Sequence, residues 1–164
     1  MRLLIVITLL ISFERATSAQ GLTLSPFSDW HVEVKAEDIR AGDDIQSTYD
    51  TRSDHLKLTG EVGSRNIFNI LFAEWKVKVQ REDRGWHHDL DLYIRRTGNG
   101  SGYFYGNSVE GANTYMRIKE GPEDLIECRG WRYDIPFQFE IRGVSLLLPA
   151  KTYRTVVIFT IIDD

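Results

Sequence analysis

An all-β fold is the class that this sequence predicts, specifically a two-layer antiparallel β-sandwich with Ig-like Greek-key order. Apolar and polar residues alternate with a period of two in most of the chain, which is typical of strands that cover a core with one face. Glycine, asparagine and aspartate cluster between the alternating segments, where turns are expected. No window keeps the 3.6-residue apolar period of a long amphipathic helix.

The size and composition indicate one packed domain. The chain has 164 residues, of which 42% are hydrophobic and 27% are charged, and its net charge is −4. This composition supports a packed core and argues against a disordered chain. The mild acidity argues against a nucleic-acid partner, because such proteins are normally basic. Cys128 is the only cysteine, so an intramolecular disulfide is excluded. We expect its thiol to be buried, and the alternative is a disulfide with another chain.

The N-terminus has the order of a secretory signal peptide. Arg2 precedes an apolar run over residues 3–13, and a polar segment of small residues then ends at Ala19. We therefore expect residues 1–19 to be a signal peptide and residues 20–164 to be a single β-sandwich domain, secreted or at the cell surface. The alternative is a buried N-terminal strand or helix. The apolar run is shorter than the roughly 20 residues that span a bilayer, and no later run is longer, so we expect no membrane span.

The expected strands follow one another along the mature chain. Each has apolar residues at every second position and polar residues between them, as expected for a strand with one buried face. They are residues 30–35, 56–59, 75–80, 89–95, 116–118 and 137–142.

Two segments are apolar on both faces, residues 66–72 and 156–162. Such segments predict strands that are buried on both sides or that await a partner strand. Short helical turns are expected only within residues 37–45 and 120–127, the second with Pro122 near its start.

The run from Trp86 to Asp91 is the strongest candidate for metal chemistry, because it holds two imidazoles and two carboxylates. On a strand, adjacent side chains point to opposite faces, so His87 and His88 would separate. His87, Asp89 and Asp91 would then share the polar face as a weak three-ligand set. A metal-dependent hydrolase that uses these residues with His88 is one alternative function. The simpler interpretation is a polar strand edge without a cofactor, which we favour.

The motifs of common enzymes are absent. Neither the GxSxG nor the HExxH pattern occurs, and Cys128 has no histidine close in sequence. Residues 95–102 are rich in glycine but lack the lysine of a phosphate-binding loop, so they predict a flexible hairpin loop. The acidic residues Asp43, Asp44 and Asp50 match no calcium-loop spacing. We therefore expect a protein that is not an enzyme.

Several aromatic residues support the first alternative function, a carbohydrate-binding module, with the metal-dependent hydrolase as the second. Exposed aromatic rings on a β-sandwich can stack on the apolar faces of sugar rings, so glycans are possible ligands. The competing interpretation is that most of these rings fill the core. The candidate ligand-binding residues are Trp86, Tyr103, Tyr105, Tyr115 and Trp131.

The C-terminal residues resemble a known ending. A Gly143 turn, a proline at position 149 and Tyr153 precede a β-branched run over residues 154–162. This pattern resembles secreted bacterial pilin-like subunits of the spore-coat-U type, although those subunits commonly carry a cysteine pair. The resemblance implies an Ig-like fold that is completed between subunits by donated strands, in surface fibres that serve adhesion.

A secreted structural or adhesion subunit is therefore the function that we expect. Its partners would be copies of itself or other surface-fibre subunits, joined through strand addition. The mature N-terminal segment, residues 20–27, could donate a strand to another chain. The alternative is that it folds back as the first strand of its own domain, and both interpretations remain open at this point.

Overall fold

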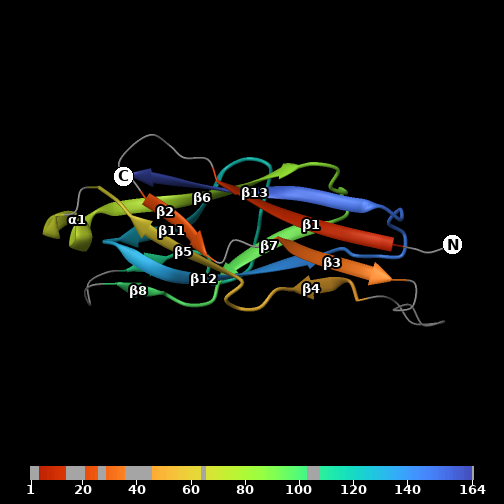
Figure 1. The fold of residues 1–164 in the computed structure, drawn as a ribbon, viewed down its shortest axis with the longest axis horizontal. Helices are drawn as coiled ribbons and strands as arrows, with labels where there is room; N and C mark the ends of the chain where they lie inside the picture. The colour runs from red at the N-terminus through yellow and green to blue at the C-terminus, as the bar shows by residue number, and fades with distance from the viewer. Residues whose placement is uncertain are drawn as a thin grey trace.

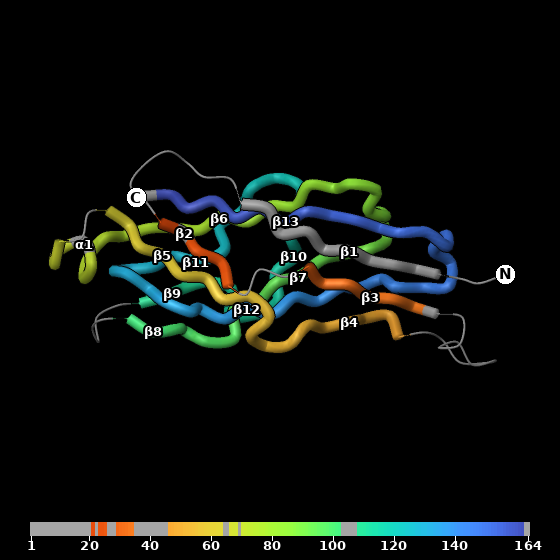
Figure 2. Tube along the Cα trace, viewed as in Figure 1, coloured from red at the N-terminus to blue at the C-terminus, as the bar shows by residue number. Residues whose placement is uncertain are grey.

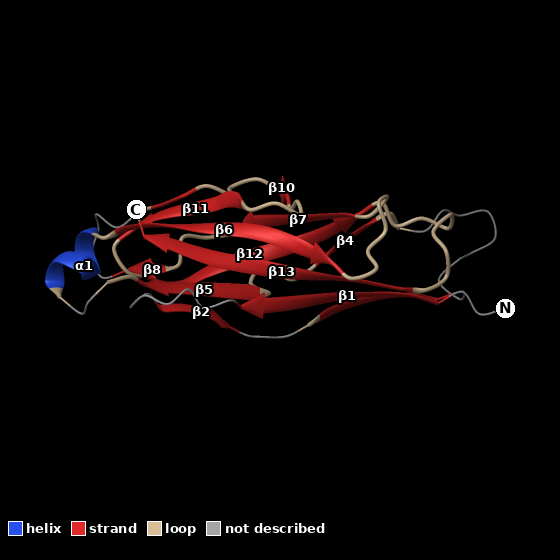
Figure 3. Ribbon diagram, turned by 90° about the horizontal axis from the view of Figure 1, so that it is seen from above, coloured by secondary structure: helices blue, strands red, loops and turns tan. Residues whose placement is uncertain are grey.

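The computed structural model of the protein describes residues 4–13, 21–25, 29–35, 46–63, 66–102 and 108–163. These residues form two β-sheets that pack against each other, with strands along the long axis of an elongated molecule (Figures 1 and 3). Adjacent strands are antiparallel with one exception among the described pairs, β1 beside β13. The predicted all-β sandwich is confirmed.

The first sheet has six strands, and it contains both the N-terminal and the C-terminal strand. In spatial order they are β3 (Trp30–Lys35), β1 (Leu4–Phe13), β13 (Thr152–Asp163), β6 (Glu74–Asp83), β11 (Glu123–Arg129) and β9 (Val109–Glu110).

The second sheet has seven strands. Five lie in the order β10 (Met116–Arg117), β7 (Asp91–Arg96), β12 (Arg132–Arg142), β5 (Leu56–Glu61) and β2 (Gly21–Ser25), and two more, β4 (Thr48–Asp50) and β8 (Ser101–Gly102), pair with β12. β12 is therefore the central strand of this sheet.

Alternate side chains fill the space between the two sheets. Trp75 and Val79 of β6 are 1% exposed, and Phe137 and Phe139 of β12 are fully buried in the same cluster. The indole N–H of Trp75 donates to the Gly130 carbonyl oxygen at 2.8 Å, so the largest core side chain also has its polar atom satisfied. This is the burial pattern that the period-two alternation predicts.

Two predicted elements are wrong. Residues 66–72 contain a six-residue helix, α1 (Ile67–Phe72), instead of a buried strand, and Phe68 on it is 72% exposed. Residues 123–129 form strand β11, paired with β6, instead of a helical turn. The other predicted turn, residues 37–45, lies outside the described residues.

α1 lies at the same end of the molecule as the C-terminus, and the loop between β12 and β13 lies at the opposite end (Figure 2). Among the described residues, no helix has the length and apolar character needed to cross a membrane.

Candidate functional site

The segment that the sequence predicts to be a signal peptide occupies a place inside the first sheet. β1 pairs in parallel with β13, from Val6↔Thr152 to Phe13↔Phe159, and in antiparallel with β3, from Leu4↔Lys35 to Leu9↔Trp30. Its backbone therefore has a strand on each side. We call the space that β1 fills between β3 and β13 the β1 slot.

The wall of this slot is mostly apolar, with one buried threonine. On β13, the residues that point toward the second sheet are fully buried; they are Tyr153, Thr155, Val157 and Phe159. The β1 positions in register with them are Ile7, Leu9, Ile11 and Phe13. Val156 and Ile158, between these positions of β13, are also buried, at 1% and 7% exposure. β13 is therefore buried on both faces from Thr155 to Phe159, and the apolar residues at positions 7, 9, 11 and 13 lie in register with its fully buried positions.

The two strands beside the slot differ in how they are held. β13 also pairs with β6 over nine residue pairs on its other side. Within the described part of the chain, β3 pairs only with β1, although Val32 and Val34 of β3 belong to the buried core cluster. β3 therefore depends on β1 for its place in the sheet.

The start of the predicted mature chain lies elsewhere. Gly21–Ser25 form β2, which pairs with β5 from Gly21↔Glu61 to Ser25↔Lys57. Of the two open interpretations for this segment, the structure shows the one in which it is a strand of its own domain.

Two of the proposed sugar-stacking residues, Trp86 and Trp131, are held within the fold. Trp131 is 5% exposed, and its indole N–H donates to the Val62 carbonyl oxygen at 2.9 Å. Trp86 is half-buried and donates to the Leu90 carbonyl oxygen at 2.7 Å. Both rings therefore help to hold the fold, and Trp131 offers no free face to a sugar.

Tyr115 lies in a cluster on the outer face of the second sheet. Its hydroxyl donates to Asp50 Oδ1 at 2.7 Å, and the Arg95 guanidinium lies 4.6 Å from its ring centre. Burial raises the pKa of the Tyr115 hydroxyl, and the hydrogen bond to Asp50 raises it further. The ring is thus already stacked and hydrogen-bonded, while Tyr103 and Tyr105 lie outside the described residues.

The histidine and aspartate run does not have the strand geometry that we expected. Residues 88–89 form a turn before β7 begins at Asp91, and the His87 and His88 rings stack with their centres 4.3 Å apart. The expectation that these rings separate is therefore wrong. His87, His88 and Asp89 come together, whereas Asp91 pairs with Arg117 at 2.6 Å and stays apart from them.

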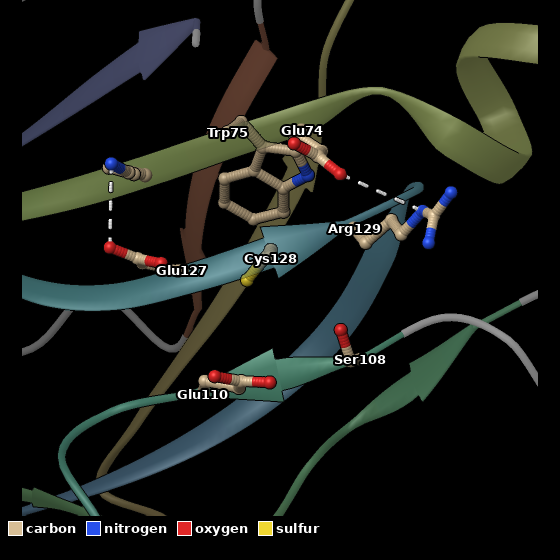
Figure 4. Close-up of a pocket in the computed structure, with 8 residues that line it drawn as sticks. Glu74, Trp75, Ser108, Glu110, Glu127, Cys128 and Arg129 are labelled. Carbon is tan, nitrogen blue, oxygen red and sulfur yellow. Dashed lines mark ion pairs between the residues drawn. The ribbon is translucent and has the colours of Figure 1, made fainter.

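A shallow hollow lies where β6, β9 and β11 meet, and Figure 4 shows its lining. Two ion pairs cross it, Lys76 with Glu127 at 3.4 Å and Arg129 with Glu74 at 3.9 Å. Cys128 is 5% exposed, and burial raises the pKa of its thiol to about 12. The thiol is therefore protonated at neutral pH and is a poor nucleophile, as expected for a cysteine that packs as a small apolar side chain.

Comparison of the chain with protein-family models, with curated proteins and with solved structures found no match. The geometry of the β1 slot is therefore the main guide to what this protein does.

Proposed function

We propose that this protein is an exported structural or adhesion subunit that joins other chains by accepting a β-strand in the β1 slot. The observation that carries the proposal is the position of β1. The residues predicted to be cleaved off, 1–19, include the whole strand that links β3 to β13. A chain that begins at residue 20 would lack this strand.

Loss of β1 would leave two unpaired strand edges. β13 would expose backbone N–H and C=O groups along the eight residues from Thr152 to Phe159, and β3 would lose its described partner. Such an edge beside apolar side chains binds another strand readily. A strand from another chain would regain both sets of backbone hydrogen bonds.

The slot also defines the chemistry of the incoming strand. It must run parallel to β13 and carry large apolar residues at four alternate positions, as residues 7, 9, 11 and 13 do. The segment 20–27 of a second copy matches this poorly, because Leu22 and Leu24 are followed by Pro26. That segment is also already used as β2. A different surface subunit or assembly partner is therefore the better donor.

The proposal can be tested with a chain of residues 20–164 and a synthetic peptide of residues 4–13. We expect the shortened chain to unfold at lower urea concentration than the full chain and to associate as its concentration rises. Equimolar peptide should raise the urea midpoint and suppress the association, because it refills the slot. Urea unfolding and analytical ultracentrifugation would measure the two effects.

Two peptides provide a matched control. One carries asparagine in place of Ile7 and Leu9, which face buried positions of β13, and the other carries asparagine in place of Val6 and Thr8, which face exposed positions. Only the second should stabilise the shortened chain, because its apolar positions opposite buried β13 residues are unchanged. A shortened chain that is monomeric, as stable as the full chain and indifferent to all three peptides would contradict the proposal.

A further inference from the structure

The turn at residues 86–90 brings two imidazole rings and one carboxylate together at the surface. His87 Nδ1 lies 3.5 Å from Asp89 Oδ2, and His88 Nε2 lies 3.3 Å from Asp89 Oδ1. One nitrogen of each histidine and one carboxylate oxygen all lie within 4.8 Å of one another. A tetrahedral ion with bonds of about 2.0–2.1 Å holds its ligand atoms about 3.3–3.5 Å apart. Only a small movement of the exposed His88 ring would be needed to close this set around an ion.

The backbone of this turn is firmly held. The Leu90 N–H donates to the His87 carbonyl oxygen at 3.0 Å, and Leu90 itself is fully buried. Gly143 has a φ of 85°, and a Cβ atom there would collide with the Asp89 carbonyl oxygen. The turn is therefore packed closely against the residue that follows β12, so its ligands do not depend on a mobile loop.

His87 is also oriented by its neighbours. Its ring meets the buried Tyr153 ring edge-on, with 5.7 Å between ring centres. His87 Nδ1 accepts a hydrogen bond from the Asp89 N–H at 3.3 Å, which places a lone pair on Nδ1. A metal ion at Nδ1 would replace this hydrogen bond, and neutral imidazole is the form that binds the ion.

We propose that His87, His88 and Asp89 bind a divalent transition-metal ion, with Zn²⁺ as the best match. Two imidazole nitrogens and one carboxylate oxygen suit Zn²⁺ or Cu²⁺, whereas Ca²⁺ and Mg²⁺ prefer sites made of oxygen ligands. Three protein ligands leave the fourth position of a tetrahedral ion open to water or to a donor from another molecule. Because the exposed His88 side chain loses conformational freedom on binding, we expect a lower affinity than at a structural zinc site with four protein ligands.

Isothermal titration of the full chain with ZnCl₂ at pH 7.5 tests this site. We expect one ion bound per chain. His88→Ala and Asp89→Asn should each lower the affinity at least tenfold. These side chains are 84% and 62% exposed, so neither change should alter the urea midpoint. His31→Ala is the matched control, because His31 is an exposed histidine on a different strand, and it should leave the affinity unchanged.

NMR spectra of the histidine ring nitrogens give a second measurement. Zn²⁺ should shift the ring signals of His87 and His88 and leave those of His31 and His55 in place. The proposal is wrong if the full chain binds no Zn²⁺ at millimolar concentration, if either ligand variant loses less than tenfold, or if His31→Ala weakens binding as much as they do.

Discussion

At the scale of single residues, Arg96 shows why the glycine-rich segment after β7 is not a free loop. Its guanidinium donates to the Gly111 carbonyl oxygen at 3.0 Å and also bonds the side chains of Asn99 and Asn113. Gly100 adopts a φ of 62°, where a Cβ atom would collide with the Tyr133 carbonyl oxygen. The prediction of a flexible hairpin missed this anchoring, because the sequence does not show which carbonyl groups a buried arginine will meet.

His55 is the residue from which we expect a pH dependence. Its half-buried ring lies near Trp30 and Phe139, with centres 6.4 and 6.2 Å away. Burial lowers the pKa of His55, Arg52 lowers it further, and Asp54 opposes them. Below the unfolded-state pKa of about 6.5, the unfolded chain binds a proton that the folded chain resists, so stability falls as pH falls.

His55→Gln removes this titrating group. We expect the drop in urea midpoint between pH 7.5 and pH 5 to be smaller in this variant than in the unaltered chain. His31→Gln, which changes an exposed histidine, should keep the full drop. Equal drops in all three proteins would show that His55 does not contribute to the acid sensitivity.

At the scale of elements, the alternation of apolar and polar residues predicts a strand well where the opposite sheet covers the apolar face of that strand. β6 alternates buried and partly exposed residues from Trp75 to Arg81, as its sequence indicates. An apolar run without alternation is ambiguous, because a short helix can carry the same residues. Residues 66–72 therefore became α1, and residues 123–129 became β11 because β6 offers a partner edge.

His87 and His88 show that a wrongly assigned element also misplaces the side chains of a candidate site. His87 and His88 are adjacent in the sequence, but the opposite-face argument assumed a strand where the chain turns before Asp91. Element boundaries are the least reliable part of a sequence-based prediction, and here the boundary decided which side chains meet.

Phe68 on α1 tests the assignment of this element. Because its side chain is 72% exposed, Phe68→Ser should change the free energy of unfolding by no more than about 0.5 kcal/mol. Phe139→Ala, at a fully buried position, should cost about 3–5 kcal/mol in the same urea titration. A comparable cost for Phe68→Ser would mean that this segment is buried, as the strand prediction required.

At the scale of the whole molecule, one segment has two readings that do not exclude each other. The long apolar run with β-branched residues over residues 3–13 is typical of a signal peptide and also of a buried strand. From the sequence alone, a signal peptide and a buried N-terminal strand are alternatives. If export removes the run, the sandwich keeps its second sheet and the β13–β6–β11 part of the first, while β3 is left without the strand that joins it to β13.

Hydrogen exchange measured by mass spectrometry can show which strands lose protection when residues 1–19 are removed. In a chain of residues 20–164, we expect the amides of β3 to exchange much faster than in the full chain, because their described hydrogen-bonding strand is gone. Amides of β12 should keep their protection, since β12 is paired on both sides within the second sheet. Adding the peptide of residues 4–13 should restore protection to β3 and to Thr152–Phe159 together, because one inserted strand pairs with both. Protection of β3 that persists without the peptide would mean that β3 closes directly onto β13, and the mature sandwich would then have no slot to fill.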